Sequence, residues 1–268
     1  MSPAPVSPPP ALDPVTLALI QNRLDHISHQ MGWVMTRTAR SPIFSQSHDF
    51  SCFPADARGT LISQADGIPI HTGGGGFAVR AILRDFRDAI EPEDVFLLND
   101  PYTAGGNHLP DWVIARPVFV AGRLVGFCCN RAHQADIGGG AAGTYNSAAT
   151  EIFHEGIRLP VLKLIERGRT RADLWRLLLL NTRLPEALEG DLHAMIGSTR
   201  IGRDTCTVLT PGRAATRARS PTLTRMVTAL MTVVALSVMV APAARRRGAS
   251  ESWAECAATA AERRSKRR

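Results

Sequence analysis

The chain has 268 residues, of which 44% are hydrophobic and 21% are charged, a composition that is typical of a globular protein and excludes a mainly disordered one. The net charge of +7 is unevenly distributed, because residues 203–268 hold 13 Lys and Arg against 4 Asp and Glu, whereas the first 202 residues carry a net charge of −2. No specific nucleic-acid partner is therefore expected, although the basic clusters of the tail could bind nucleic acid nonspecifically.

The cysteines and the first residues indicate the compartment. The five cysteines show neither C-x-x-C spacing nor a regular disulfide framework, and their odd number favours a reduced, cytoplasmic setting. Residues 1–12 are rich in proline and lack a basic region followed by an apolar core, so they predict a flexible leader and not a secretory signal.

The first predicted helix begins after Asp13, which can cap it, with Pro14 at the first helical position. One apolar face should be buried through about Ala39, since apolar residues recur at steps of three and four, at Leu17, Ile20, Leu24, Ile27, Met31 and Val34. The segment from Ser41 to Ala65 then predicts a loop and short strands, with a hairpin turn at residues 56–59.

Four consecutive glycines, residues 73–76, lead into a second predicted helix that carries Val79, Ile82, Leu83 and Phe86. A glycine-rich turn at a helix N-terminus can hold an anion. This turn lacks the lysine and hydroxyl of a P-loop, so a tight start to the helix is the alternative interpretation.

The stretch from Phe96 to Gly140 holds two copies of an H-x-x-D pattern, His108 with Asp111 and His133 with Asp136, each after an apolar run that predicts a strand. Imidazole and carboxylate groups that converge from two segments are common ligands of divalent metals. Residues 121–123 predict a turn between the two apolar runs, and the resulting hairpin would bring both patterns side by side. The alternative is that these residues are ordinary turn formers and surface histidines.

Downstream, Glu151 and Glu155 are spaced to share one helical face and could act as general bases, or could be two solvated carboxylates. A leucine-rich helix is predicted from Asp173 and another over residues 185–201. Together these elements predict an α+β fold, with mixed strands and helices and a metal site on loops between strands.

Several motifs in residues 13–202 resemble the hydantoinase B and 5-oxoprolinase family: TRTARSPIFSQSHDFSC, NDPYTAGGNHLPD, NRAHQADIGG and ATEIFHEGIRLP. That family includes the B-type component of ATP-dependent N-methylhydantoinase and is similar to the alpha subunits of acetone and acetophenone carboxylases. The resemblance implies that His108, Asp111 and His133 bind a divalent metal such as Mn or Zn, with Asp136 as a fourth ligand or as a supporting partner. Gln134 departs from the family pattern, in which a histidine or tryptophan often follows the first histidine of the second motif.

The same resemblance places Arg37, Ser41 and Asp49 in the active site, where an Arg and an Asp could grip a substrate amide or carboxylate or could form a structural ion pair. His71 resembles a position that the family keeps near its active site. The candidate catalytic residues are therefore Asp136, His71 and Glu151.

The activity implied by the resemblance is metal-assisted hydrolysis of a cyclic amide of the hydantoin or 5-oxoproline type. A hydantoinase A-type partner would use ATP to phosphorylate the substrate carbonyl, so a hetero-oligomer is expected, and this chain would act on the activated intermediate. The alternatives are the alpha subunit of an ATP-dependent ketone carboxylase and an inactive, truncated fragment.

The tail from residue 203 loses the periodic pattern and becomes rich in Arg and Ala. We interpret it as an atypical end, either frameshifted or disordered, a hypothesis that reading the DNA in another frame would test. Residues 226–244 form an apolar run that precedes three arginines, so a C-terminal membrane anchor is the alternative localisation.

Overall fold

The structure is a computed structural model that describes residues 13–208 except 66, 69–70 and 72–73. The proline-rich leader, the apolar run 226–244 and the rest of the basic tail after residue 208 lie outside the described residues, whereas residues 203–208, expected to belong to that tail, continue the helix Pro185–Val208. Within the described part of the chain, no helix combines the length and the apolar character that crossing a membrane requires.

The centre of the fold is a six-stranded sheet in the order β1-β4-β3-β2-β5-β6, in which every neighbouring pair is antiparallel. The α+β class predicted from the sequence is confirmed. The strands are β1 (Phe50–Asp56), β2 (Val95–Leu98), β3 (Asp111–Val120), β4 (Arg123–His133), β5 (Leu162–Glu166) and β6 (Arg169–Thr170).

The hairpin predicted around residue 122 is confirmed as β3 and β4. Ala121 and Gly122 connect the strands with φ angles of 50° and 76°, which suits a two-residue turn whose twist matches that of the strands. The register that follows from this turn pairs Val120 with Arg123 and, at the open end of the hairpin, Asp111 with His133.

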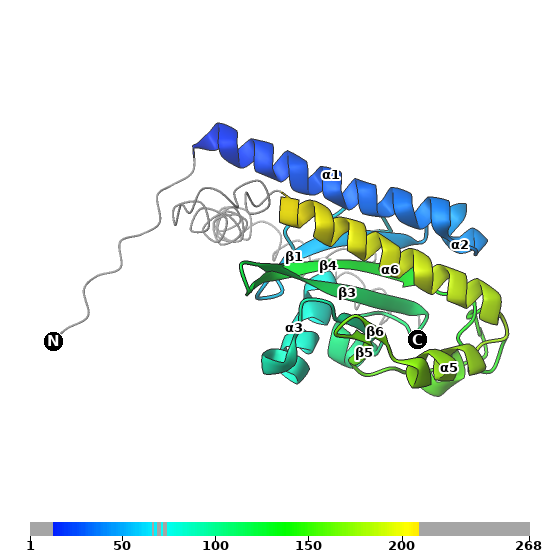
Figure 1. The fold of residues 1–268 in the computed structure, drawn as a ribbon. Helices are drawn as coiled ribbons and strands as arrows, with labels where there is room; N and C mark the ends of the chain where they lie inside the picture. The colour runs from blue at the N-terminus through cyan, green and yellow to red at the C-terminus, as the bar shows by residue number, and fades with distance from the viewer. Residues whose placement is uncertain (1–12, 66, 69–70, 72–73, 209–268) are drawn as a thin grey trace, which may run out of the picture.

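Helices cover both faces of the sheet (Figure 1). The long helices α1 (Pro14–Thr38) and α6 (Pro185–Val208) lie side by side on one face, and α3 (Gly75–Phe86) lies on the other. The predicted cap of α1 is confirmed, since the carboxylate of Asp13 accepts hydrogen bonds from the backbone N–H groups of Val15 and Thr16. The shorter elements are α2 (Pro42–Ser45), α4 (Pro101–Ala104), α5 (Ala172–Leu180) and the 3-10 turns Arg87–Ala89 and Ile152–Glu155.

Each face of the sheet has its own apolar core, because successive side chains of a strand point to opposite faces. Cys128 belongs to the core under α1 and α6, while its neighbour Cys129 belongs to the core under α3. Residues 129, 131 and 133 of β4 therefore share the α3 face, as do residues 111, 113 and 115 of β3. The ends of these two strands supply the candidate site.

Candidate metal centre

Three side chains converge at the open end of the β3–β4 hairpin. The Nε2 atom of His108 lies 2.7 Å from Oδ1 of Asp111 and 3.3 Å from Nδ1 of His133, and Nδ1 of His133 lies 3.4 Å from the same Oδ1. Asp111 is the first residue of β3 and His133 is the last residue of β4. The sequence predicted that all three residues lie on loops. Only His108 does, because Asp111 and His133 lie at the ends of paired strands.

Two of the three separations, 3.3 and 3.4 Å, fit donor atoms around one divalent metal, whereas the 2.7 Å between Nε2 of His108 and Oδ1 of Asp111 is a hydrogen-bond distance. Ligand atoms that each lie about 2.1 Å from one ion are about 3.0–3.4 Å apart in octahedral or tetrahedral geometry. Among the described residues, His108, Asp111 and His133 form a group with donor atoms that could hold a metal ion. We call these three residues the metal group. Asp111 and His133 are buried, whereas the side chain of His108 is 29% exposed, which leaves one side of the group open to solvent.

The hydrogen bonds of His133 orient its ring for metal binding. The hydroxyl of Thr144 donates its single proton to the carbonyl of Gly143, 2.7 Å away. That hydroxyl must therefore accept from Nε2–H of His133, which lies 2.8 Å from it. The proton of a neutral His133 is thus held on Nε2, and the lone pair of Nδ1 faces His108 and Asp111.

A second chain of hydrogen bonds holds Asp111 from behind. The Nε2 atom of His71 lies 3.1 Å from Oδ2 of Asp111, and Nδ1 of His71 lies 3.1 Å from the hydroxyl of Ser51. An ionised carboxylate only accepts, so Nε2 of His71 carries the proton and Ser51 donates to Nδ1. The carboxylate thereby keeps Oδ1 directed toward His108 and His133.

The charges of the site favour an ionised Asp111. Burial by itself would raise the pKa of Asp111, but the hydrogen bonds from His108 and His71, together with the adjacent ring of His133, outweigh it and hold the pKa well below its usual range. Burial would likewise lower the pKa of His108, yet the hydrogen bond and charge of Asp111, together with the charges of Glu155 and Asp49, raise it. The charges of two further carboxylates, Glu155 and Asp49, therefore act on His108.

Asp136, expected as a fourth ligand or as a supporting partner, lies outside the group formed by His108, Asp111 and His133. Its Oδ2 atom lies 2.9 Å from a guanidinium nitrogen of Arg183, and its Oδ1 atom accepts from the backbone N–H groups of Gly138 and Arg183. These bonds hold the turn after β4 against the segment that precedes α6. The second H-x-x-D copy thus contributes its histidine to the metal group and its aspartate to the turn.

The three residues expected to bind substrate occupy different places. Arg37 is exposed near the end of α1, and Ser41 is buried at the start of α2, where its N–H bonds to Asp191 of α6. No contact among the described residues joins either one to the metal group. Asp49 is adjacent to that group, since its carbonyl accepts from the N–H of His133 at 3.1 Å.

A cavity of about 540 Å³ is lined by Asn107, the residue before His108, although none of His108, Asp111 and His133 lines it. Glu151 and Glu155 both line it from the Ile152–Glu155 turn and its flank, and Oε2 of Glu155 accepts from the N–H of Leu109. Glu151 pairs with His154 at 3.3 Å. The full lining is Pro101, Tyr102, Gly106, Asn107, Ala149, Thr150, Glu151, Ile152 and Glu155.

Sequence reasoning missed Ser51, Thr144 and Tyr145. Ser51 carries one signal, because it is a buried polar residue inside the apolar run of β1. Tyr145 is 73% exposed, and its ring stacks on that of His133 with centroids 5.2 Å apart. The side chain of Gln134, the departure from the family pattern, contacts Met195 of α6 and so faces the other side of the sheet.

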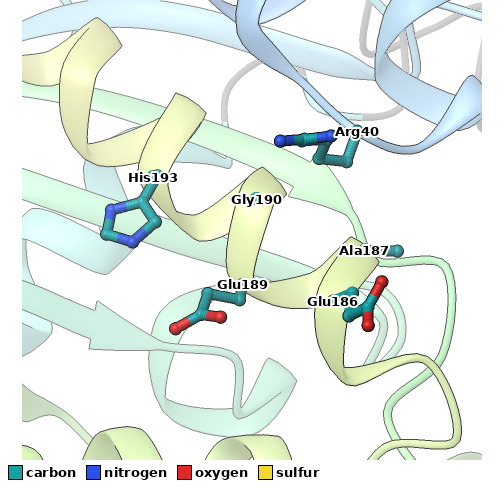
Figure 2. A pocket seen from close by; sticks show the side chains of 6 residues that line it. All are labelled: Arg40, Glu186, Ala187, Glu189, Gly190 and His193. Carbon is teal, nitrogen blue, oxygen red and sulfur yellow. The ribbon is translucent and has the colours of Figure 1, made fainter.

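A second cavity, of about 710 Å³, lies over the first half of α6 (Figure 2). Figure 2 shows His193 and Glu189 projecting from α6 and Arg40 lying near Gly190. A Cβ atom on Gly190 would collide with the Arg40 side chain, so glycine permits this approach. None of the metal-group residues lines this cavity, so it is a hollow separate from the candidate site.

Comparison with known proteins gives a consistent result. The chain is 37% identical to an uncharacterised protein of Methanocaldococcus jannaschii, MJ0963, over 71% of this chain and 34% of that protein. It is also 37% identical to the beta subunit of the caprolactamase of Pseudomonas jessenii, over 71% of this chain and 33% of the relative. The chain thus spans about a third of the length of these curated relatives.

Solved structures resemble the fold over most of the described residues. The ATP-dependent caprolactamase of Pseudomonas jessenii superposes with a TM-score of 0.74 and 34% identity, covering 84% of this chain and 37% of that one. A nucleotide-free acetone carboxylase superposes with a TM-score of 0.71 and 19% identity, and the match covers 82% of this chain and 28% of that one. At this identity the match shows a likeness of fold alone. The Hydantoinase B/oxoprolinase family model matches residues 13–244. The match extends past residue 202, where the resemblance was expected to end. The chain therefore belongs to the hydantoinase B/oxoprolinase family.

Proposed function

We propose that this chain is a subunit of an ATP-dependent amide-ring hydrolase and that it binds one divalent metal through His108, Asp111 and His133. The observation that carries the proposal is the convergence of Nε2, Oδ1 and Nδ1 within 3.4 Å at the open end of one hairpin. Membership of a family whose relatives include proteins named as caprolactamase and hydantoinase subunits and as 5-oxoprolinases supports a cyclic amide as substrate.

A metal such as Mn or Zn at this position would supply Lewis-acid chemistry, polarising an oxygen of the substrate or of water. The cavity lined by Asn107 and Glu155 is large enough for a small cyclic amide, and Tyr102 in its lining is 76% exposed and available for contact. Glu155 lies closest to the metal group of the two glutamates, so it is the proposed proton carrier, with Glu151 binding at the cavity edge.

His71 and Asp136 receive supporting roles in this proposal. His71 orients the ligand Asp111 through Oδ2, and Asp136 holds the turn that carries Thr144 and Tyr145. Two relatives are named as single components of multi-subunit enzymes, the caprolactamase and a D-/L-hydantoinase. Those names support a hetero-oligomer in which a hydantoinase A-type partner uses ATP to activate the substrate. The ketone carboxylase alternative has only the fold likeness in its favour.

The test is an assay of the purified full chain with an A-type partner, ATP and each of caprolactam, hydantoin and 5-oxoproline. We expect ring opening coupled to ATP consumption and about one metal ion per chain. His108→Ala and His133→Ala should each remove the metal and reduce turnover by at least about a thousandfold, because each variant deletes one of the three proposed ligands. His26→Ala is the matched control, since His26 is exposed on α1, remote from the group.

Turnover and metal content that persist in a folded His108→Ala/His133→Ala double variant would overturn the proposal. Carboxylation of acetone in place of ring opening would assign the chain to the ketone carboxylases. Metal binding without turnover on any of these substrates would support the fragment interpretation.

A further inference from the structure

Arg131 of β4 is a buried cation without a matching anion. Its residue exposure is 1%, and its Nη1 and Nη2 atoms reach only the carbonyls of Gly105 and Ala104, both at 3.4 Å. Its Nε atom has no hydrogen-bond partner. Among the described residues no carboxylate lies within ion-pair distance of its guanidinium group, and the charge of Asp111 acts on it from farther away. A buried charge normally has such a partner, because removing it from water is costly.

The positive end of a helix lies against the same guanidinium group. Helix α3 has Gly74 as its N-cap, without a side-chain hydrogen bond at the cap, and Gly74 lies against the guanidinium group of Arg131. A Cβ atom on Gly74 would collide with Nη1 of Arg131, so only glycine lets the two approach. The first turn of a helix carries partial positive charge, which makes it unfavourable beside a buried cation and favourable beside an anion.

The position of Arg131 relates this positive region to the metal group. Arg131 and His133 are two residues apart on β4, so their side chains share the α3 face and their Cα atoms are about 7 Å apart. Arg131 also pairs directly with Val113 of β3 and with Ser51 of β1, the serine that bonds to His71. A ligand with an anionic group at one end and a reactive carbon at the other could therefore reach both places.

We propose that Arg131 and the first turn of α3 bind the phosphate group of a phosphorylated small molecule whose other end lies at His108, Asp111 and His133. The inference rests on the proposed function, in which the substrate arrives as a phosphorylated intermediate. A phosphate oxygen would replace the two long carbonyl contacts of the guanidinium group, and Nε would gain a partner. Guanidinium and backbone N–H groups are the usual partners of phosphate in proteins.

The experiment titrates inorganic phosphate into the full chain by calorimetry, at constant ionic strength set with chloride and after removal of metal with a chelator. We expect saturable binding to the metal-free protein and a weaker response to acetate. Arg131→Gln and Gly74→Ala should each weaken phosphate binding at least tenfold, the first by removing the charge and the second by displacing the guanidinium group. Arg116→Gln is the matched control, because Arg116 is a buried arginine of the same sheet, near Glu93.

Gly74→Ala keeps the test decisive if Arg131→Gln fails to fold, because Gly74 has a φ of −74° that alanine adopts without strain. Wild-type phosphate affinity in folded Arg131→Gln or Gly74→Ala would overturn the inference. Phosphate binding that requires added metal would also overturn it, since the ion itself would then hold the phosphate. Either result leaves the proposed function standing, because metal content and ring opening are measured separately.

Discussion

Asp111 and His133 face each other as a directly paired couple in the β3–β4 hairpin, with Oδ1 and Nδ1 3.4 Å apart. The couple lies at the end of the hairpin opposite the turn, so the length and register of the two strands determine whether it forms. A shift of one residue would turn one of the two side chains toward α6. The candidate metal group is therefore a property of strand pairing as much as of the residues themselves.

Removing the support behind Asp111 should weaken metal binding. His71→Ala removes the donor to Oδ2, and we expect metal affinity to fall about 10–100-fold, with a smaller loss for Ser51→Ala, which removes only the partner of Nδ1. Competition with a chelator measures the affinity. Ser28→Ala, at a buried serine of α1 that bonds to Ser63, is the control and should bind as wild type. Equal affinities in all three variants would contradict the orienting role of His71.

Thr144→Val should misorient His133. Valine is similar in shape but neither accepts from Nε2 of His133 nor donates to the carbonyl of Gly143. We expect about a tenfold loss of metal affinity and a loss of about 1 kcal/mol in the free energy of unfolding. Thr205→Val is the control, since the hydroxyl of Thr205 bonds only to the carbonyl of Ile201 on α6. An unchanged metal affinity would show that the ring of His133 needs no such partner.

Asp136→Asn should destabilise the turn after β4 in a pH-dependent manner. Burial would raise the pKa of Asp136, but the hydrogen bonds from Arg183, Gly138 and Gly143 hold it below its usual value. Because the folded pKa is the lower one, the carboxylate stabilises the fold above about pH 4, and that contribution is lost as the pH falls through the folded pKa.

We therefore expect Asp136→Asn to reduce the free energy of unfolding by about 2 kcal/mol at pH 7, with the difference narrowing below about pH 4. Urea unfolding at a series of pH values measures it. Metal content of the variant is the second measurement, since Asp136 lies outside the metal group. Loss of the metal from a variant whose turn remains intact would restore Asp136 as a ligand.

Lys163→Met should destabilise the protein by leaving the buried carboxylate of Asp94 without the cation that β5 supplies. Nζ of Lys163 lies 2.9 Å from Oδ2 of Asp94, and both side chains are at least nine-tenths buried. We expect the free energy of unfolding to fall by about 3 kcal/mol, measured with urea, because the carboxylate is left without its cation. The Asp94→Asn/Lys163→Met double variant should recover part of the loss. A double variant that is less stable than the sum of both single losses would contradict this explanation.

The sequence by itself determined the long helices, the β3–β4 hairpin and the meeting of three of the four residues expected at the metal site. The capped first helix follows from Asp13 and Pro14, and the hairpin follows from the turn at Ala121 and Gly122. Convergence of His108, Asp111 and His133 could be predicted because a two-residue turn and strict alternation set which side chains meet. These are local rules that act within about twenty-five residues.

Only the tertiary structure decided which groups surround the metal ligands. Asp136 turns away because Arg183, far along the chain, offers a guanidinium group and a backbone N–H in a place that no local rule predicts. His71 meets the site for the same reason, since α3, which follows it, is held against the sheet by burial of its apolar face. Hydrophobic burial is not directional, so it brings segments together without a sequence signal for the polar contacts that result.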